Sequence, residues 1–265
     1  MADILNGTFE RLGERALALL EDVGKAVFMA RSAFRWFMRG HVEIRQTATQ
    51  CMRIGSDSLP VTAMTSFFTG MVLALQSGTT SQYIFNEPLY VGTVVGFSVV
   101  MELGPVLTAM VVAGRGGAAI AAEIGTMKVT EQIDALNTLG TGPIRYLVIP
   151  RYLACLFTLP ILTVFSAASG ICGGMIVSVW KLGIPSTVYS GDIWNFMKIH
   201  HFMHGYLKSY VFAFVIATVS CHRGLQTTGG AEGVGKSTTA AVVVSMVSIL
   251  LLDYFATAVL VAFGI

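Results

Sequence analysis

Five long stretches of apolar residues constrain this sequence more than any other feature, because each is long enough to cross a lipid bilayer. A membrane-spanning helix needs about 20 mostly apolar residues. The stretches cover approximately residues 59–77, 89–113, 147–180, 206–220 and 238–263, and Phe202 and Met203 extend the fourth. We therefore predict an all-α, polytopic integral membrane protein with about five transmembrane helices.

The composition favours a membrane protein over a soluble domain. Of the 265 residues, 54% are hydrophobic and 12% are charged, whereas soluble domains carry about 25% charged residues. Lipid must therefore cover much of the surface. The formal net charge of +2 indicates no particular partner, and we expect no nucleic acid. The four cysteines lack metal-ligand spacing and are interpreted as small apolar residues.

The distribution of Lys and Arg predicts the orientation of the chain. If the N-terminus is cytoplasmic, that side carries eight basic residues before the first span, four between spans two and three, and two between spans four and five. The opposite side carries three: Lys181, Lys198 and Lys208. We predict a cytoplasmic N-terminus and a C-terminus on the outer side. The first residues lack the apolar region of a signal peptide, so insertion is expected to rely on the first span.

The third apolar stretch is too long for one straight crossing of the bilayer. It contains Pro150, Pro160 and a glycine-rich patch at 170–174. We expect this stretch to be kinked, strongly tilted or partly re-entrant.

Charge is concentrated in residues 1–57, which hold eight Lys/Arg and seven Asp/Glu and form a region distinct from the transmembrane domain at 58–265. Between residues 17 and 37, apolar side chains recur every three or four positions with arginines between them. A basic amphipathic helix with aromatic residues is typical of the membrane interface. The alternative is a cytoplasmic helix that packs on the rest of the protein.

Two motifs suggest other chemistry but do not fit their context. Residues 230–237 read Gly-Ala-Glu-Gly-Val-Gly-Lys-Ser and match GxxxxGK[ST], but a phosphate loop follows a β-strand, whereas this one follows a predicted span. We interpret it as a glycine-rich cytoplasmic turn before the last span, and we expect no ATPase site or cofactor in this chain. His200, His201 and His204 could bind a metal, but we interpret them as an interfacial cluster and predict no metal site.

Ionisable residues inside spans need a reason, because each costs at least about 2.5–3.5 kcal/mol at the bilayer centre. Glu102 lies in the middle of the second span, three residues before Pro105. Lys208 lies near the outer end of the fourth span, where it could extend to the interface. We predict that Glu102 and Lys208 line the polar part of a substrate cavity; alternatively, they pair for packing alone. Asp253 is interpreted as structural.

The segment between the second and third spans, residues 114–143, has helical character from Ala118 onward. Apolar residues share one face, and acidic and basic residues are interspersed among them. A short helix at the cytoplasmic surface suits docking into a groove on a soluble partner, although an ordinary loop helix would show the same pattern.

Spaced pairs of small residues in the spans, such as Gly92 with Gly96 and Gly170 with Gly174, suit helix–helix contact. Because five spans are few for a complete path, we expect a homodimer.

Several runs together resemble the MlaE/YrbE family, the permeases of MCE-associated ABC transporters. They are Glu-Leu-Gly-Pro at 102–105, Ala-Gly-Arg-Gly-Gly-Ala at 113–118, Ala-Glu-Ile-Gly-Thr-Met-Lys-Val-Thr-Glu-Gln-Ile-Asp-Ala-Leu at 122–136, Lys-Ser-Tyr-Val-Phe-Ala at 208–213 and Leu-Leu-Asp-Tyr-Phe-Ala-Thr at 251–257. The resemblance covers residue 50 to the end. One departure is Lys236-Ser237, where family members often have Arg-Ala; it alone creates the phosphate-loop match.

The resemblance implies a homodimeric permease in the bacterial inner membrane with an N-terminal interfacial helix and a periplasmic C-terminus. Its partners would be a cytoplasmic ABC ATPase that uses ATP, a STAS-domain protein and a periplasmic ring of MCE-domain proteins, and its cargo would be phospholipid. A coupling helix would cover residues 123–136, and the coupling residues would be Arg115, Glu123, Gly125, Met127, Lys128, Glu131 and Asp134. The lipid cavity would include Glu102 and Lys208 and be bordered by Met71, Leu75 and Tyr83.

We therefore predict a transport subunit without its own ATPase activity that moves phospholipids or related lipids. The alternative is an ion-coupled secondary transporter of a lipidic substrate with Glu102 as the coupling carboxylate. A membrane scaffold without transport is a further alternative, which the carboxylate at the membrane centre argues against.

Overall fold

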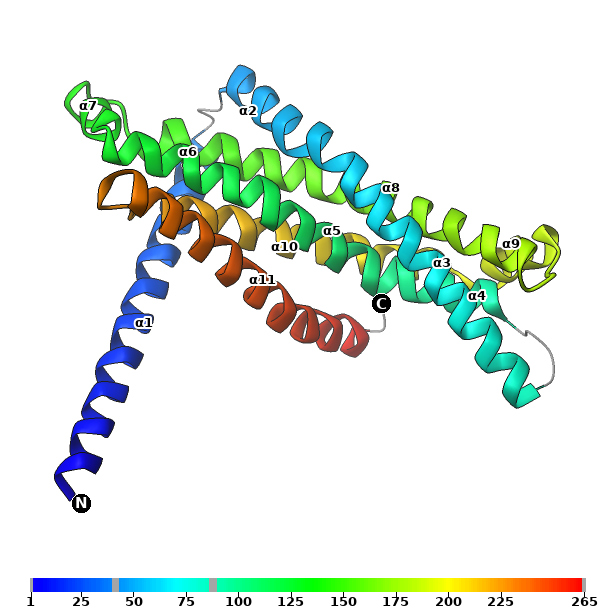
Figure 1. Cartoon of the computed structure of the whole chain (residues 1–265). Helices are drawn as coiled ribbons and strands as arrows, with labels where there is room; N and C mark the ends of the chain where they lie inside the picture. Colours follow the sequence, from blue (N-terminus) through cyan, green and yellow to red (C-terminus); the bar gives the residue numbers. More distant parts are fainter. Residues whose placement is uncertain (1, 40–42, 86–89, 264–265) are drawn as a thin grey trace.

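The computed structural model describes residues 2–39, 43–85 and 90–263, and these residues form helices joined by short turns (Figure 1). The α-helices are α1 (Ala2–Met38), α2 (Ile44–Cys51), α3 (Asp57–Phe85), α4 (Val91–Phe97), α5 (Gly104–Val112), α6 (Ala118–Val129), α7 (Gln132–Thr138), α8 (Ile149–Trp180), α9 (Ser186–Phe196), α10 (Ile199–Leu225) and α11 (Gly230–Ala262). Four π-helical segments lie among them: η1 (Met52–Ser56), η2 (Ser98–Leu103), η3 (Ala113–Gly117) and η4 (Ile144–Val148).

Within these described ranges, five helical runs are long and apolar enough to cross a membrane, which confirms the predicted all-α, five-span fold. They are Ile44–Ile84, Val91–Val129, Ile144–Trp180, Ile199–Leu225 and Gly230–Ala262. In Figure 1 the turn before α7 and the turn between α10 and α11 lie at one end of the bundle, and α9 lies at the other. We call these the α7 end and the α9 end; the Lys/Arg distribution predicts that the α7 end is cytoplasmic.

The second span is longer than its apolar run. Helix continues without a break from α4 through η2, α5 and η3 to the end of α6. Ile120, Ile124 and Gly125 are buried in the bundle, where α6 packs against α10 and α11. The expectation of a separate surface helix from Ala118 is therefore wrong for α6, because its small and apolar residues let it extend the span.

The third span is one continuous helix, α8, which includes Pro160. The re-entrant alternative is therefore wrong. Its 32 residues correspond to about 48 Å at 1.5 Å per residue, longer than the ~30 Å hydrocarbon core. The helix must therefore tilt or extend beyond the core.

Helices α3 and α8 meet along a glycine seam formed by Gly70, Gly170 and Gly173. A Cβ atom at Gly70 would overlap the carbonyl oxygen of Gly170, and one at Gly173 would overlap the carbonyl oxygen of Phe67. The Ser169 hydroxyl also donates a hydrogen bond across the seam to the Ala63 carbonyl, at 2.8 Å. Small residues thus bring two spans into backbone contact, as is common in membrane bundles.

Helix α11 packs far less than the other late spans. Only 11% of the most apolar stretch of α11 is buried inside the protein, against 44% of the corresponding stretches in the third and fourth spans. Its outer face exposes large apolar side chains, among them Val243, Val247, Leu250, Leu251, Tyr254 and Phe255.

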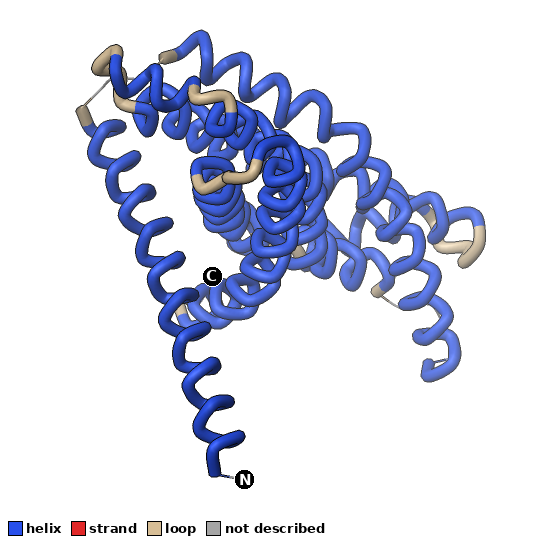
Figure 2. Tube along the Cα trace, turned by 60° about the vertical axis from the view of Figure 1, so that its left-hand side comes forward, coloured by secondary structure: helices blue, strands red, loops and turns tan. Residues whose placement is uncertain are grey.

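Helix α1 leaves the bundle at an angle, and its N-terminal half projects away from it (Figure 2). Met29 and Ala33 are buried against the bundle, while Leu20, Phe28 and Phe34 are more than 60% exposed. The helix therefore combines features of both expectations for this region: it packs on the bundle at its C-terminal half and presents an apolar surface elsewhere.

Candidate functional site

The transmembrane bundle contains an ionic cluster that joins three spans, which we call the Lys208 triad: Glu102, Lys208 and Asp253. The ammonium nitrogen of Lys208 on α10 lies 2.5 Å from Oε2 of Glu102 on η2 and 2.9 Å from Oδ1 of Asp253 on α11. The Lys208 side chain has no exposed surface. The expectation that it reaches the interface is therefore wrong, because two carboxylates hold it inside the bundle. Asp253, interpreted from sequence as structural, belongs to the same cluster.

Local backbone geometry brings Glu102 and Lys208 together. Glu102 lies in the π-helical segment η2, just before Gly104 and Pro105, and π-helical turns occur often at functional sites. On α10, Gly205 lies so close to η2 that a Cβ atom there would overlap the carbonyl oxygen of Val100. This close approach places Lys208, about one turn further along α10, beside the Glu102 carboxylate.

The three members of the triad differ in exposure. The side chain of Glu102 is 43% exposed on the protomer, that of Asp253 is 15% exposed, and that of Lys208 is fully buried. A carboxylate in the middle of a span is very costly to present to hydrocarbon. The exposed side of Glu102 must therefore face a polar cavity or another protein surface.

An apolar cavity of about 440 Å³ lies between η2, α8 and α10, and none of the three triad residues lines it. Its lining includes Val100 and Tyr206, which are two residues before Glu102 and Lys208 and therefore point to a different side of their helices. The remaining lining comes from α8 and α10: Thr163, Val164, Ala167, Ala168, Ile171, Phe202 and Met203. The same two segments, η2 and α10, thus carry charged groups on one side and border apolar volume on another.

The other residues predicted to border a lipid cavity lie on the first span. Met71 and Leu75 are half-buried on α3, and the Tyr83 side chain is 92% exposed at the far end of that helix. None of the three lines the 440 Å³ cavity, so their role stays a prediction.

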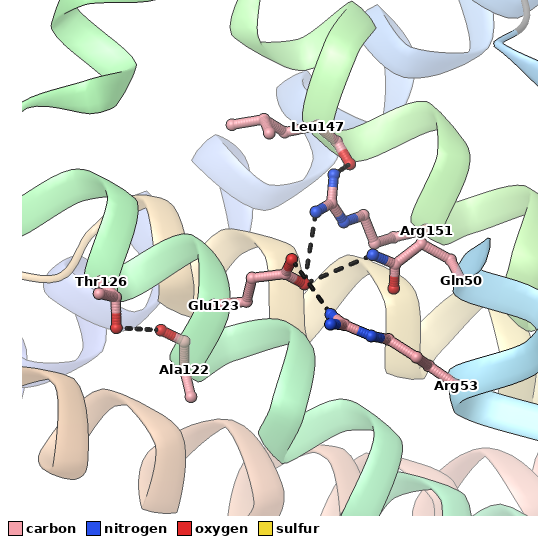
Figure 3. A network of polar contacts seen from close by, with 7 residues as sticks. All are labelled: Gln50, Arg53, Ala122, Glu123, Thr126, Leu147 and Arg151. Atoms are coloured by element: carbon pink, nitrogen blue, oxygen red, sulfur yellow. Dashed lines mark hydrogen bonds and ion pairs between the residues drawn. The ribbon is translucent and has the colours of Figure 1, made fainter. Parts of the chain in front are cut away.

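A second ionic cluster, which we call the Glu123 network, is drawn in Figure 3; it is centred on α6, the helix that leads to the α7 end of the bundle (Figure 1). The Glu123 carboxylate on α6 pairs with Arg151 of α8 at 3.4 Å and with Arg53 of η1 at 3.5 Å. It also accepts a hydrogen bond from the Gln50 amide at 3.4 Å. Arg151, which is 4% exposed, donates a further hydrogen bond to the Leu147 carbonyl at 2.8 Å. One carboxylate thus ties together three spans.

Two of the predicted coupling residues therefore hold the bundle together. Glu123 points inward, and Arg115 of η3 forms an ion pair with Asp57 at the start of α3, at 3.1 Å. Gly125 is buried next to Thr227, and Met127 packs partly against the core.

The exposed part of the predicted coupling segment is the turn between α6 and α7. The prediction of one helix over residues 123–136 is wrong, because Glu131 adopts a left-handed conformation, with φ 59°, between the two helices. Lys128 and Asp134 pair across this turn at 3.2 Å. Glu131 and Asp134 are exposed, so the turn presents acidic side chains at the end of the bundle.

The GxxxxGKS segment forms the first turns of α11. It follows a turn after helix α10, without a preceding strand, and only Gly229 and Gly230 have the positive φ angles of a turn, 85° and 67°. Lys236 pairs along the helix with Glu232 at 2.7 Å. The expected turn over residues 230–237 is thus limited to its first glycine, and the segment lacks the strand and loop of a phosphate-binding site.

The three histidines lie at the start of α10. The rings of His200 and His201 contact each other with centroids 3.9 Å apart, while His204 is buried. Among the described residues, no group of three His, Cys, Asp or Glu side chains is arranged to hold a metal ion.

The fold and the triad define a multi-pass membrane protein with a charged site shared by three of its spans. The family model described as Permease MlaE matches residues 47–259, so the chain belongs to the MlaE permease family, as the sequence motifs predicted. It is a transmembrane permease of an ABC transporter, a transport subunit that acts with an ATPase subunit.

Relatives support this assignment over most of their length. The chain is 43% identical over 246 residues to a probable ABC transporter permease protein of Rickettsia felis, covering 93% of this chain and 95% of the relative. It is 42% identical over 230 residues to a probable ABC transporter permease protein of Synechocystis, covering 87% of each. It is also 38% identical over 218 residues to the chloroplastic protein TRIGALACTOSYLDIACYLGLYCEROL 1 of Arabidopsis thaliana, covering 82% of this chain and 62% of the relative.

Proposed function

We propose that this permease moves phospholipids or related hydrophobic lipids between the inner membrane and a periplasmic MCE protein. It works as a homodimer, and ATP hydrolysis in the separate ATPase subunit drives it. The observation that carries the proposal is the Lys208 triad, whose Glu102 carboxylate is 43% exposed in the middle of a span that also borders an apolar cavity.

An amphiphilic cargo matches this combination of surfaces. Acyl chains can occupy apolar volume between the spans, of which the 440 Å³ cavity is an example, while the polar head can approach the exposed Glu102 carboxylate. Binding sites of this type place a few polar groups in a largely apolar wall to fix the orientation of the ligand. The name of the Arabidopsis relative contains that of a galactosylated diacylglycerol, which agrees with a lipidic cargo.

The exposure of the protomer supports a homodimer. Glu102 is 43% exposed at mid-span, and α11, which carries Asp253, is the least buried span. A second copy packed against this face would remove the carboxylate from lipid and enclose a shared cavity between two equivalent surfaces.

The turn between α6 and α7 is the proposed contact with the ATPase. Glu131 and Asp134 are exposed there, and α6 leads directly from this turn to Glu123, which is bonded to the first and third spans. A movement imposed at the turn would therefore reach three spans. Lipid transport then requires that the two conformations bind lipid with different affinities. The STAS-domain protein, the MCE ring, the cytoplasmic N-terminus and the periplasmic C-terminus follow from the family resemblance and the charge distribution.

The central test is transfer of a fluorescent phospholipid by the complex reconstituted with its ATPase in liposomes. We expect Glu102→Ala to assemble normally and to lose transport at least tenfold, because the exposed carboxylate proposed to contact the lipid head is removed. Glu232→Ala, which removes an exposed carboxylate from the start of α11, is the matched control. Unchanged transfer by Glu102→Ala would contradict the cavity role.

The docking assignment has its own test. Replacing Glu131 and Asp134 together by Lys is expected to abolish co-purification of the ATPase, while Glu232→Lys should leave it intact. A stable complex of the double variant would contradict docking at this turn. Lipid transfer that continues without ATP and stops when ion gradients are dissipated would instead favour an ion-coupled transporter.

A further inference from the structure

A second apolar cavity, of about 590 Å³, lies between α1, α10 and α11. It shares no lining residue with the 440 Å³ cavity between η2, α8 and α10, and its volume is within the range of small-molecule sites, about 300–1,000 Å³. We call it the α1 groove. Its apolar lining comprises Val23, Ala26, Val27, Phe214, Val215, Val219, Val244 and Leu252, and Thr218 and Ser248 complete the wall.

One end of the α1 groove is charged, because Asp22, His222 and Arg223 also line it. The two carboxylate oxygens of Asp22 lie 2.9 Å from Nε2 of His222 and 2.9 Å from Nη2 of Arg223. Burial raises the pKa of the Asp22 carboxyl group, but hydrogen bonds from His222 and Gln226 and the charge of Arg223 outweigh burial, so its pKa lies below the ordinary value. Asp22 therefore stays ionised at neutral pH and fixes the position of the Arg223 guanidinium.

The geometry leaves Arg223 able to bind an anion. Its side chain is 28% exposed, and a guanidinium carries five N–H donors in a planar fork that matches phosphate. Arg223 lies near the end of α10, at the α7 end of the bundle. The charge distribution predicts that this end is cytoplasmic, and lipid phosphates lie at that depth.

The apolar part of the groove needs a partner within the bilayer. Val23 and Val27 are each 60% exposed and Phe214 is 46% exposed, so α1 covers the groove without filling it. An acyl chain is the apolar group that a bilayer supplies at this position, and each buried CH₂ contributes about 0.8 kcal/mol. A single lipid can thus cover the apolar wall and place its phosphate at the exposed part of Arg223.

We infer that the α1 groove binds one glycerophospholipid, with an acyl chain between α1, α10 and α11 and its phosphate at Arg223. This lipid is a bound constituent of each protomer that fastens α1 to the bundle, and it is distinct from the transported cargo. The inference depends on the membrane placement of the spans and is independent of what the triad carries.

The test uses the full complex in detergent with phosphatidylglycerol that carries a photoreactive group in its acyl chain. After irradiation, mass spectrometry of peptides locates the cross-links. We expect them on α1, α10 and α11 around the groove. Val27→Trp should fill the groove and reduce these cross-links at least fivefold, whereas Phe28→Trp, which changes a neighbouring 68%-exposed side chain outside the lining, should not.

The phosphate contact is tested with a charge variant and a second lipid. Arg223→Gln should weaken phosphatidylglycerol binding about tenfold, as expected for a lost hydrogen bond to a charged group, while Lys236→Gln, which removes an exposed charge at the same end, should have no effect. Photoreactive diacylglycerol, which lacks phosphate, should label the groove weakly both in the unchanged protein and in Arg223→Gln.

Two results would overturn the inference: equal labelling by the two lipids, or labelling that is unchanged by both Val27→Trp and Arg223→Gln. Co-purification of the ATPase checks that each variant is assembled. Groove labelling should persist in Glu102→Ala, so that a failure of the lipid-cavity proposal and a failure of the groove remain distinguishable.

Discussion

The Lys208 triad and the Glu123 network are built from the same kinds of side chain, yet they differ in stoichiometry, spacing and exposure. The triad surrounds one buried cation with two carboxylates at 2.5 and 2.9 Å. The network surrounds one carboxylate with two arginines at 3.4 and 3.5 Å. In the triad an anion reaches the protomer surface, whereas in the network Arg53 is the most exposed member, at 65%.

This difference distinguishes the triad, a candidate binding site, from the network, which acts as a joint that connects spans able to shift. A buried ammonium held at short distances cannot move without leaving two carboxylates uncompensated in the membrane, so the triad presents a fixed charge to whatever enters beside it. The longer contact between Glu123 and Arg53, which is 65% exposed, can lengthen or re-form at little cost. The network can therefore stay connected while the spans shift.

The largest effect is expected from Lys208→Met, which removes the only cation of the triad. Two carboxylates then remain close together inside the bundle, and breaking a buried ion pair in this way costs about 3–5 kcal/mol. We expect loss of folded protein, measured as the yield of monodisperse complex and as the melting temperature.

A triple variant sharpens this prediction. Lys208→Met combined with Glu102→Gln and Asp253→Asn removes the charge imbalance, so folding should largely recover while lipid transfer stays absent. Equal melting temperatures for Lys208→Met and the unchanged protein would show that the triad contributes nothing to assembly.

An intermediate effect is expected from Glu123→Gln. The amide keeps the shape of the side chain but removes the charge opposite Arg151, which is 4% exposed, and a buried group left without its partner costs about 1–3 kcal/mol. The ATPase should remain bound, while the number of lipids moved per ATP hydrolysed should fall severalfold. Glu131→Gln, which changes an exposed side chain on the same segment, is the control for stability. A coupling ratio equal to that of the unchanged protein would argue against the network as a joint.

The smallest effect is expected from Arg53→Gln. Exposed ion pairs contribute at most about 1 kcal/mol, so the melting temperature should change little. A double-mutant cycle with Glu123→Gln measures the coupling energy between the two side chains directly. A coupling energy as large as that of the triad would erase the distinction drawn between the two clusters.

The sequence predicted the spans and the importance of Glu102 and Lys208 because long apolar runs and misplaced charges are local signals. It did not predict that Asp253 completes the triad, since the 44 residues between Lys208 and Asp253 give no indication of which faces of α10 and α11 meet. The sequence motifs likewise assign Glu123 to coupling with the ATPase, because nothing near Glu123 in the sequence indicates that Arg53 and Arg151 approach it from other spans. Which charged side chains pair across a bundle depends on how each helix is rotated about its own axis. The pattern of apolar residues specifies this rotation poorly in a membrane, because the lipid-facing and core-facing sides of a helix are both apolar.

The glycine seam has a mechanical consequence for the transport cycle. Because the backbones of α3 and α8 touch at Gly70 and Gly173, with no side chains between them to change rotamer, neither helix can roll on the other without a collision. The first and third spans therefore act as a single strut. Any opening of the bundle must then occur by displacing the second, fourth or fifth span relative to this strut, and a bulky residue introduced into the seam would separate the two helices of the strut.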